Sequence, residues 1–237
     1  MKHAMRILLV RVGADQSPAG GGYNGPVDTS TNQFVYVGIP ELHPLHRGYE
    51  RRYGSTRLTA ELARMGTCIP PGLLGRCMHT DPDFEHATYG DHGRRAAQLK
   101  RLARGDVLVF YAGLRDVRRS GLVYALIGQL TLDQSMPANR IADPLLNVHA
   151  QRRRVDPDDW VLIGTRRGSG RYDRCIPVGE FRDGAYRVKR ALLRTWGGLS
   201  VKDGFLQRSG GFPHFIEPDR FLGWLAAQRV RLVRRNF

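Results

Sequence analysis

The chain has 237 residues, of which 41% are hydrophobic, 37 are basic and 22 are acidic, giving a formal net charge of +15 at pH 7. This length allows a substantial core without disulfide or metal support, and the three cysteines lack the spacing of a disulfide framework, which fits a reducing cytoplasm. No apolar run reaches the length of a membrane span and the short N-terminal run is too short for a secretory signal, so we expect a cytoplasmic protein without a membrane partner.

The first half of the chain predicts short strands separated by irregular segments. Residues 5–12 form an apolar run of strand length, and residues 34–39 have the same character. Residues 14–26 contain four glycines and two prolines, which predicts a loop. Residues 42–77 are rich in Gly, Pro, His and Arg and predict an irregular insertion, with one short helix at about 56–65.

Strands dominate the second half. A helix at residues 94–104, with Gly105 as its C-cap, leads into the first of them. The further predictions are strands at residues 106–112, 122–132, 161–165, 174–178 and 186–188, a hairpin turn at 182–185, and a terminal helix at 221–230 after the start signal Pro218-Asp219. Because regular helices do not separate the strands, we predict an α+β fold with a mixed, mainly antiparallel sheet, in a single domain spanning residues 1–237.

The segment from His79 to His92 concentrates titratable side chains in a strongly basic chain. It contains four carboxylates and three histidines. Acidic groups repel phosphate, so such a cluster near a surface that binds polyanions calls for an explanation, and general acid/base chemistry is one. The alternative is a solvated loop in which Asp91 caps the helix expected to begin near Gly93.

The positive charge comes mostly from arginine. Only four of the 37 basic residues are lysines, which leaves 33 arginines. Arginine binds phosphate in a bidentate manner and stacks on bases, although a GC-rich genome also favours its codons. Arginine pairs are spread along the chain, so we expect a surface that binds nucleic acid, with DNA as the partner.

Three other segments carry side chains suited to a nucleotide. The loop at residues 14–26 follows a strand, so Asp15 and Asn24 could contact a ligand there; a flexible surface loop is the alternative. Tyr111 at a strand end could stack a flipped base or be an ordinary core tyrosine. The basic tract around residues 168–172 could contact phosphate or be a solvated hairpin.

Several enzyme classes lack their signatures in this chain. It has no Walker loop, no Gly-x-Ser-x-Gly nucleophile elbow and no deaminase zinc motif. Cys68, Cys77 and His79 are conceivable zinc ligands, but a fourth partner and the usual paired spacing are missing. We therefore expect no metal site and no cofactor.

Three blocks of sequence carry a family resemblance. They are Arg11-Val-Gly-Ala-Asp15 with the following loop and Val37-Gly-Ile-Pro-Glu41, then Asp81-Pro-Asp83 with the helix after it, then Gly105-Asp-Val-Leu-Val-Phe-Tyr-Ala-Gly-Leu-Arg115. Together they resemble the nucleotide-modification-associated domain proteins of phage and bacterial DNA-modification conflict loci. The resemblance covers roughly the first half of the chain and implies work on modified bases in DNA, with anti-phage DNA glycosylases that excise glucosylated hydroxymethylcytosine as the closest activity. The third block also resembles PUA-like and EVE-type readers of modified bases, which implies a PUA-like partial barrel with flanking helices as the alternative form of the fold.

The leading interpretation is a DNA glycosylase that extrudes a modified base from phage DNA, cleaves its glycosidic bond and leaves an abasic site. A carboxylate near the anomeric carbon would stabilise developing positive charge and orient water. The candidate catalytic residues are Asp15, Asp81 and Asp83, with Asn24 and His79 positioning water or the base; the candidate substrate-binding residues are Tyr23, Phe84, Tyr89, Tyr111 and Arg115; and the candidate phosphate contacts are Arg166, Arg167 and Arg171. The alternatives are a non-catalytic PUA-like reader and a base-modifying transferase, and release of free base would separate the first interpretation from both.

Overall fold

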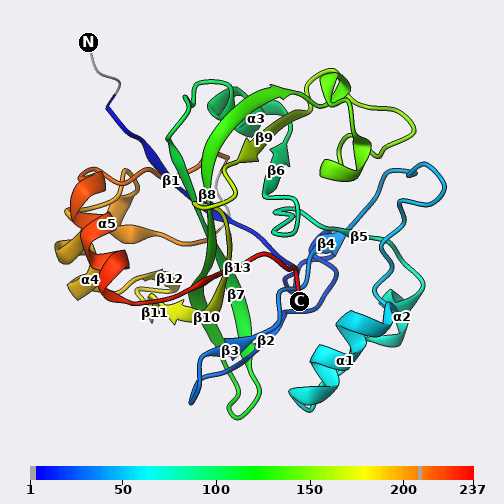
Figure 1. Ribbon diagram of the computed structural model, residues 1–237. Coiled ribbons are helices and arrows are strands. Elements are labelled where there is room, and N and C mark those ends of the chain that lie inside the picture. Colours follow the sequence, from blue (N-terminus) through cyan, green and yellow to red (C-terminus); the bar gives the residue numbers. More distant parts are fainter. Residues whose placement is uncertain (1–3, 208–209) are drawn as a thin grey trace.

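The computed structural model describes residues 4–207 and 210–237 (Figure 1). The strands are β1 (Ile7–Arg11), β2 (Pro26–Asp28), β3 (Gln33–Phe34), β4 (Ile39–Pro40), β5 (Met78–His79), β6 (Thr88–Asp91), β7 (Val107–Asp116), β8 (Leu122–Pro137), β9 (Trp160–Gly164), β10 (Gly170–Pro177), β11 (Gly179–Arg182), β12 (Ala185–Val188) and β13 (Leu232–Val233). The α-helices are α1 (Thr56–Arg64), α2 (Pro71–Leu74), α3 (Gly93–Leu99), α4 (Arg190–Trp196) and α5 (Pro218–Ala227), and short 3-10 helices are η1 (Ala138–Arg140), η2 (Pro144–Leu146) and η3 (Lys202–Gly204).

The main sheet is mixed and mainly antiparallel, which confirms the predicted α+β class. Its strand order is β13-β10-β8-β7-β2-β3, and β7 pairs in parallel with β1 along its first half and with β2 near its end. The long strand β8 pairs with β7 and β10, and its last residues pair with β9, which in turn pairs with β6. The strands of the described residues form no closed barrel.

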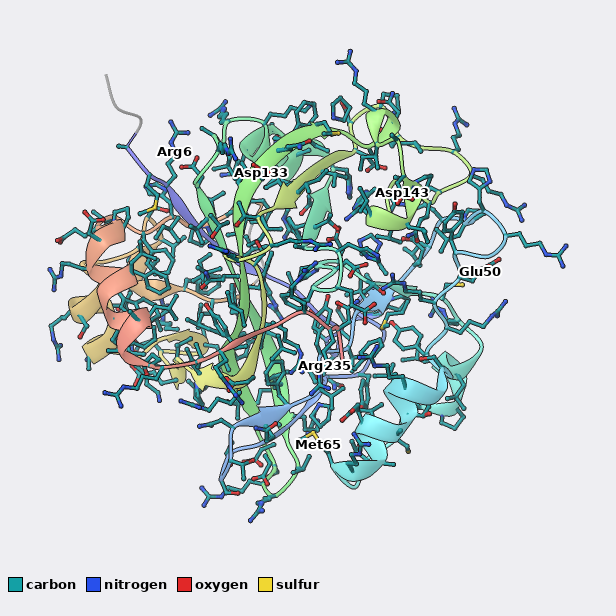
Figure 2. All side chains as sticks on the ribbon, in the orientation of Figure 1. Arg6, Glu50, Met65, Asp133, Asp143 and Arg235 are labelled. Atoms are coloured by element: carbon teal, nitrogen blue, oxygen red, sulfur yellow. The ribbon has the colours of Figure 1, made fainter. Side chains whose placement is uncertain are left out.

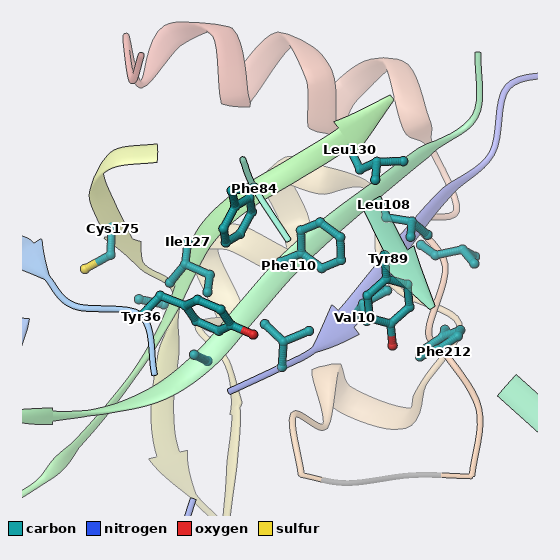
Figure 3. Close-up of a cluster of buried hydrophobic side chains, with 14 of the residues drawn as sticks. Val10, Tyr36, Phe84, Tyr89, Leu108, Phe110, Ile127, Leu130, Cys175 and Phe212 are labelled. Atoms are coloured by element: carbon teal, nitrogen blue, oxygen red, sulfur yellow. The ribbon is translucent and has the colours of Figure 1, made fainter. Parts of the chain in front are cut away.

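Side-chain alternation along β1 and β7 divides the core between the two faces of the sheet. Ile7 and Val109 belong to the cluster that α4 and α5 cover, which contains the buried Trp196. Val10 and Phe110 lie in the cluster on the other face, which Figure 3 shows. A strand buried on both faces reads as a continuous apolar run, and this explains the unbroken hydrophobic sequences of β1 and β7.

Most predicted elements differ from the structure by a few residues at their ends, for example β8, β10 and α5, and two differ in kind. The predicted strand at residues 34–39 is reduced to β3 and β4, because the intervening backbone has no continuous partner strand: Val35 donates to the carbonyl of Pro26, the first residue of β2, and Val37 accepts from the amide of Ala14 in a loop. The predicted helix at 94–104 ends at Leu99 as α3, and Gly105 is not its C-cap, because its amide donates to the Leu132 carbonyl instead.

The interpretation of Asp91 as a helix cap is wrong. Asp91 is the last residue of β6, and the N-cap of α3 is His92, which makes no side-chain capping bond. Neither β6 nor α4 was predicted. The short helix predicted at about 56–65 is confirmed as α1, and the predicted hairpin turn at 182–185 joins β11 to β12.

In the ranges 4–207 and 210–237, no helix has both the length and the apolar character needed to cross a bilayer.

Candidate functional site

A pocket of about 270 Å³ lies where β4, β5 and β6 face the irregular segment between η2 and β9. Its lining includes His79 from β5, Asp81 just after it, Gly90 from β6 and His149 from the irregular segment. Ligand pockets commonly range from about 300 to 1,000 Å³, so this volume suits a small ligand such as a single base.

Pairing of short strands positions the first of these side chains. β4 and β5 pair so that Ile39 lies opposite His79, which brings Glu41 close to the His79 ring. Gly38 is required at this pairing, because a Cβ there would lie 2.3 Å from the His79 carbonyl oxygen. The local structure therefore fixes both the imidazole and its carboxylate partner.

Gly90 links Asp81 to His149. Its amide donates to Asp81 Oδ2 at 2.7 Å, and a Cβ at this position would lie only 2.6 Å from His149 Cδ2. The His149 ring thus occupies the space that any side chain at position 90 would fill. On the other side, the Tyr36 hydroxyl donates to the Asp81 carbonyl at 2.7 Å and holds the main chain of the aspartate.

His79, Asp81 and His149 converge on one point. Asp81 Oδ2 lies 3.7 Å from Nε2 of His79 and 3.3 Å from Nε2 of His149, and ligand-type atoms of all three residues lie within 4.8 Å of one another. All three side chains are largely buried. Asp81 Oδ1 and His149 Nε2 are buried and make no hydrogen bond. Buried polar atoms normally have a partner, and both residues line the pocket, so a water or ligand bound there would supply one.

The Nδ1 atoms of both imidazoles lie close to carboxylates. Glu41 Oε2 lies 2.6 Å from His79 Nδ1, and Asp159 Oδ1 lies 2.9 Å from His149 Nδ1. Arg152 connects the Glu41–His79 pair to the Asp159–His149 pair. Its guanidinium lies 3.3 Å from Glu41 Oε2, 3.0 Å from Asp159 Oδ2 and 3.1 Å from His149 Nδ1. A charged network thus surrounds the pocket floor.

Electrostatics within this network shift the pKa values of its members. Burial alone would lower the pKa of His79, but hydrogen bonds and charge interactions with Asp81 and Glu41 raise it to about 9. Burial would raise the pKa of Glu41, but His79 and Arg152 lower it to about 2. The pKa of Asp159 is also lowered, because the influence of His149 and Arg152 exceeds that of burial. All of these shifts favour the charged forms.

Aromatic and basic residues form the wall of the pocket. The Tyr89 hydroxyl donates to Asp91 Oδ2 at 2.8 Å, and the Arg95 guanidinium lies 3.7 Å from the same oxygen. Arg11 also lines the pocket and pairs with Asp15 at 3.3 Å. In Figure 2, nitrogen-tipped side chains project around much of the outline of the molecule. An anionic ligand would meet positive charge at this wall and over the surrounding surface.

Three of the candidate residues inferred from the sequence line this pocket, namely His79, Asp81 and Tyr89. The other polar candidates have partners elsewhere. Asp15 accepts hydrogen bonds from Ser17 within its own loop, and Asn24 donates to the Gly113 carbonyl at 2.7 Å.

Asp83 is buried and belongs to a different network. It pairs with Arg51 and His86 and accepts from the Asn236 amide at 3.0 Å. Its amide and carbonyl also pair with those of Thr88, which closes the turn before β6. These contacts give Asp83 a role in fixing the turn and the C-terminal segment.

The remaining aromatic candidates lie in the interior. Phe84 packs edge-on against Tyr36 and Phe110 in the core (Figure 3). Tyr111 faces the opposite side of the sheet and donates to the Leu206 carbonyl at 2.7 Å, and the half-buried ring of Tyr23 packs against the cluster around α1. None of these three rings lines the pocket.

The candidate arginines differ in exposure. Arg115, Arg166 and Arg167 are exposed and available to a polyanion. Arg171 is buried, donates to the Arg235 carbonyl and lies over the Phe34 ring, so its guanidinium faces the interior and not the surrounding solvent.

Sequence reasoning did not identify Glu41, His149, Arg152 and Asp159 as site residues. The spacing His79-x-Asp81 was the one sequence signal for this site, since it places two ligand-type side chains close together. The third residue of the cluster, His149, comes from an irregular segment far away in the sequence. Asn147 holds that segment in place by accepting from the His149 amide and donating to the Thr88 hydroxyl.

Comparison with known families gave one match. A family model described as nucleotide modification associated domain 3 matches residues 6–197, which include every residue of the pocket and its charged network. Comparisons with curated proteins and with solved structures gave no match.

Proposed function

The chain belongs to the nucleotide modification associated domain 3 family, and we propose that it is an enzyme that hydrolyses the N-glycosidic bond of a modified base in DNA. Family membership links the protein to nucleotide modification. The observation that supports a reaction is the buried Asp81 at the pocket floor, with one oxygen that makes no hydrogen bond and two imidazoles beside it. Perturbed titratable groups in a concave pocket are typical of active sites.

Hydrolysis of a glycosidic bond needs chemistry that this pocket can supply. The bond between C1′ and the base nitrogen breaks, its electron pair leaves with the base, and water adds a hydroxyl group to C1′ while one proton goes to the departing base. Positive charge develops on the sugar in the transition state, and a nearby carboxylate stabilises it. Asp81 is the carboxylate that we assign to this role, with Tyr89 on the wall against which a flipped base would pack.

A non-catalytic reader is less well supported by the same pocket. Readers of single bases hold them mainly by stacking between aromatic side chains. Of the proposed stacking residues only Tyr89 lines the pocket, and its ring is itself buried in the core cluster that contains Phe84, while Tyr111 is enclosed on the other face of the sheet. A floor of buried carboxylates and histidines suits a reaction better than passive binding.

A transferase with a donor nucleotide in the glycine-rich loop is also less well supported. Gly20, Gly22 and Gly25 have the spacing of a dinucleotide-binding motif, but that motif requires a helix directly after the loop. Here the loop leads into β2, and none of its described residues from 14 to 26 lines the pocket.

The test is direct measurement of released base. Duplexes containing cytosine, hydroxymethylcytosine or glucosylated hydroxymethylcytosine are incubated with the protein, followed by mass spectrometry of free bases and alkaline cleavage at abasic sites. We expect release from modified DNA, with the glucosylated phage-type base as the proposed best substrate. Binding without release would favour the reader, and dependence on a nucleotide-sugar donor would favour the transferase.

Two variants assign the reaction to the pocket. Asp81→Asn should lower the rate of release by about 10²-fold or more, the range typical for loss of an acid/base group. Asp183→Asn is the matched control, because Asp183 is exposed in the turn between β11 and β12 and its positive φ is tolerated by asparagine. Equal rates for both variants and the wild type would remove Asp81 from the mechanism.

A further inference from the structure

The donor atoms at the pocket floor have the composition of a metal site. Two imidazole nitrogens and one carboxylate lie within 4.8 Å of one another, on residues of β5, the turn after it and the segment before β9. Zinc ligands lie about 2.0–2.2 Å from the ion, so small rotations of these side chains would bring all three to a shared ion. Such an ion would also provide partners for Asp81 Oδ1 and His149 Nε2, which have no hydrogen bond.

The residues behind the imidazoles support the same conclusion. Metal-ligating histidines usually donate their second ring N–H to a carboxylate, which orients the ring and leaves the other nitrogen free for the metal. Glu41 holds this position for His79, with which it makes a hydrogen bond of 2.6 Å. At His149 the carboxylate of Asp159 lies 2.9 Å from Nδ1, but this oxygen makes no hydrogen bond and the Arg152 guanidinium is 3.1 Å from the same nitrogen. Arg152 contacts both carboxylates and therefore holds the Glu41–His79 pair and the Asp159–His149 pair in place relative to each other.

The charge balance of the site also favours a dication. Asp81, Glu41 and Asp159 are buried carboxylates, and Arg152 is the basic side chain that contacts two of them. With neutral imidazoles, as a bound metal requires, this group carries a net charge of about −2; with His79 protonated, as its raised pKa favours when no metal is bound, it carries about −1. Burying uncompensated charge is costly. A divalent cation would neutralise it. Without a metal, protonated imidazoles would have to do so, in a purely structural ion-pair network.

We propose that the pocket binds one divalent transition-metal ion through Nε2 of His79, a carboxylate oxygen of Asp81 and Nε2 of His149. Two histidines and one carboxylate, with the remaining positions open, are typical of catalytic zinc and non-haem iron sites and not of closed structural sites. The side facing the pocket would take water or substrate. This inference revises the expectation of no metal, and the conceivable ligands Cys68 and Cys77 do not belong to the cluster.

A metal here would change how the proposed reaction runs. Asp81, as a ligand of the dication, would hold the ion instead of stabilising positive charge on the sugar, and metal-bound water, which loses a proton near neutral pH, would supply the nucleophile for C1′. This catalytic role rests on the proposed function, whereas the binding of the ion does not.

The test begins with metal binding to the whole protein. The purified chain is treated with EDTA, exchanged into metal-free buffer and titrated with Co²⁺, with visible absorption and thermal unfolding as readouts. We expect one Co²⁺ per chain, displacement by Zn²⁺ and a higher midpoint of unfolding, because a ligand that binds the native state stabilises it. No binding at micromolar to millimolar Co²⁺ would overturn the proposal.

Variants and spectroscopy identify the ligands. Asp81→Asn and His149→Gln should abolish the Co²⁺ spectrum, Asp159→Asn should weaken binding by about 10–100-fold, and His46→Ala, which removes an exposed imidazole, should bind as the wild type does. Circular dichroism checks that each variant folds. If the ligand variants unfold, X-ray absorption of the Zn²⁺-loaded wild type decides: two imidazoles and no sulfur support the site, and sulfur ligands overturn it.

The two proposals fail in different ways. One bound Co²⁺ with no base released from any modified DNA would support the metal site and overturn the glycosylase function. Base release at the full rate by protein that elemental analysis shows to be metal-free would support the glycosylase and overturn the role of the metal.

Discussion

Substitution of Gly90 by alanine tests the packing that places His149 over the pocket. Gly90 does not have a positive φ, so alanine can adopt its backbone conformation. The added Cβ would lie 2.6 Å from His149 Cδ2 and 3.1 Å from Nε2. Non-bonded carbon atoms prefer separations of about 3.5–4.0 Å, so the ring must move by roughly 1 Å.

We expect two consequences of this displacement. Overpacking of a buried site typically costs about 1–3 kcal/mol, which urea denaturation of wild type and Gly90→Ala would measure. A displacement of about 1 Å in a reacting group can lower activity about 10²-fold, so base release and Co²⁺ affinity should fall more than stability does. Wild-type stability together with wild-type metal affinity would refute the argument that Gly90 makes room for His149.

Gly223→Ala is the matched control for this experiment. Gly223 is an exposed residue within α5, and a Cβ there meets no atom within 4 Å. Glycine in a helix interior is about 0.5–1 kcal/mol less favourable than alanine, so this variant should gain stability and keep full activity. The same chemical change would then have opposite effects at the two positions.

Three other outcomes follow from burial and charge. Cys175 is enclosed and burial raises its thiol pKa to about 12, so at pH 8 it should resist a thiol reagent that labels the exposed Cys68, and become reactive only in denaturant. Charge reversal at Arg166 and Arg167 should weaken binding to modified and unmodified DNA alike and reduce the slope of log K against log salt by about 2, as filter binding at several salt concentrations would show; a loss confined to modified DNA would contradict a phosphate role. Phe84→Ala should lose about 3–5 kcal/mol of stability in urea denaturation, and a stable variant with selectively lost base binding would restore Phe84 as a stacking residue.

The elements that the sequence predicted are those whose signals are local. β1 and β7 are apolar runs that a strand buried on both faces requires, and the terminal helix begins at Pro218 as a helix start signal suggests. Residues 34–39 show the limit of such signals. Val35 and Val37 face one cluster and Phe34 and Tyr36 face another, as in a strand, but the backbone of Val35 bonds to the start of β2 and that of Val37 to a loop, and local sequence does not specify these partners.

The site was predictable only where its members are close in sequence. The acidic and histidine-rich segment contained His79 and Asp81, but composition could not separate Asp81 from Asp83, which lies two residues on and faces Asn236 and His86 instead. His149 had no signal of its own. The His149 ring can lie at the pocket only because Gly90 has no side chain. Neither composition nor periodicity shows that a glycine leaves room for a residue distant in the sequence.

Exposed arginines give the surface a positive charge, whereas buried carboxylates lie at the floor of the pocket. This difference bears on which part of a nucleotide would enter the pocket. Arg115, Arg166 and Arg167 are exposed, and under the proposed function they would contact phosphates at the surface, where each contact releases counterions. The floor has the opposite sign, because its three buried carboxylates outnumber the positive charges of Arg152 and of His79, whose pKa is raised. A phosphate would be repelled there, and a floor neutralised by a bound dication would offer it no excess positive charge. The proposed function therefore requires an uncharged base to enter the pocket while the exposed arginines contact its backbone.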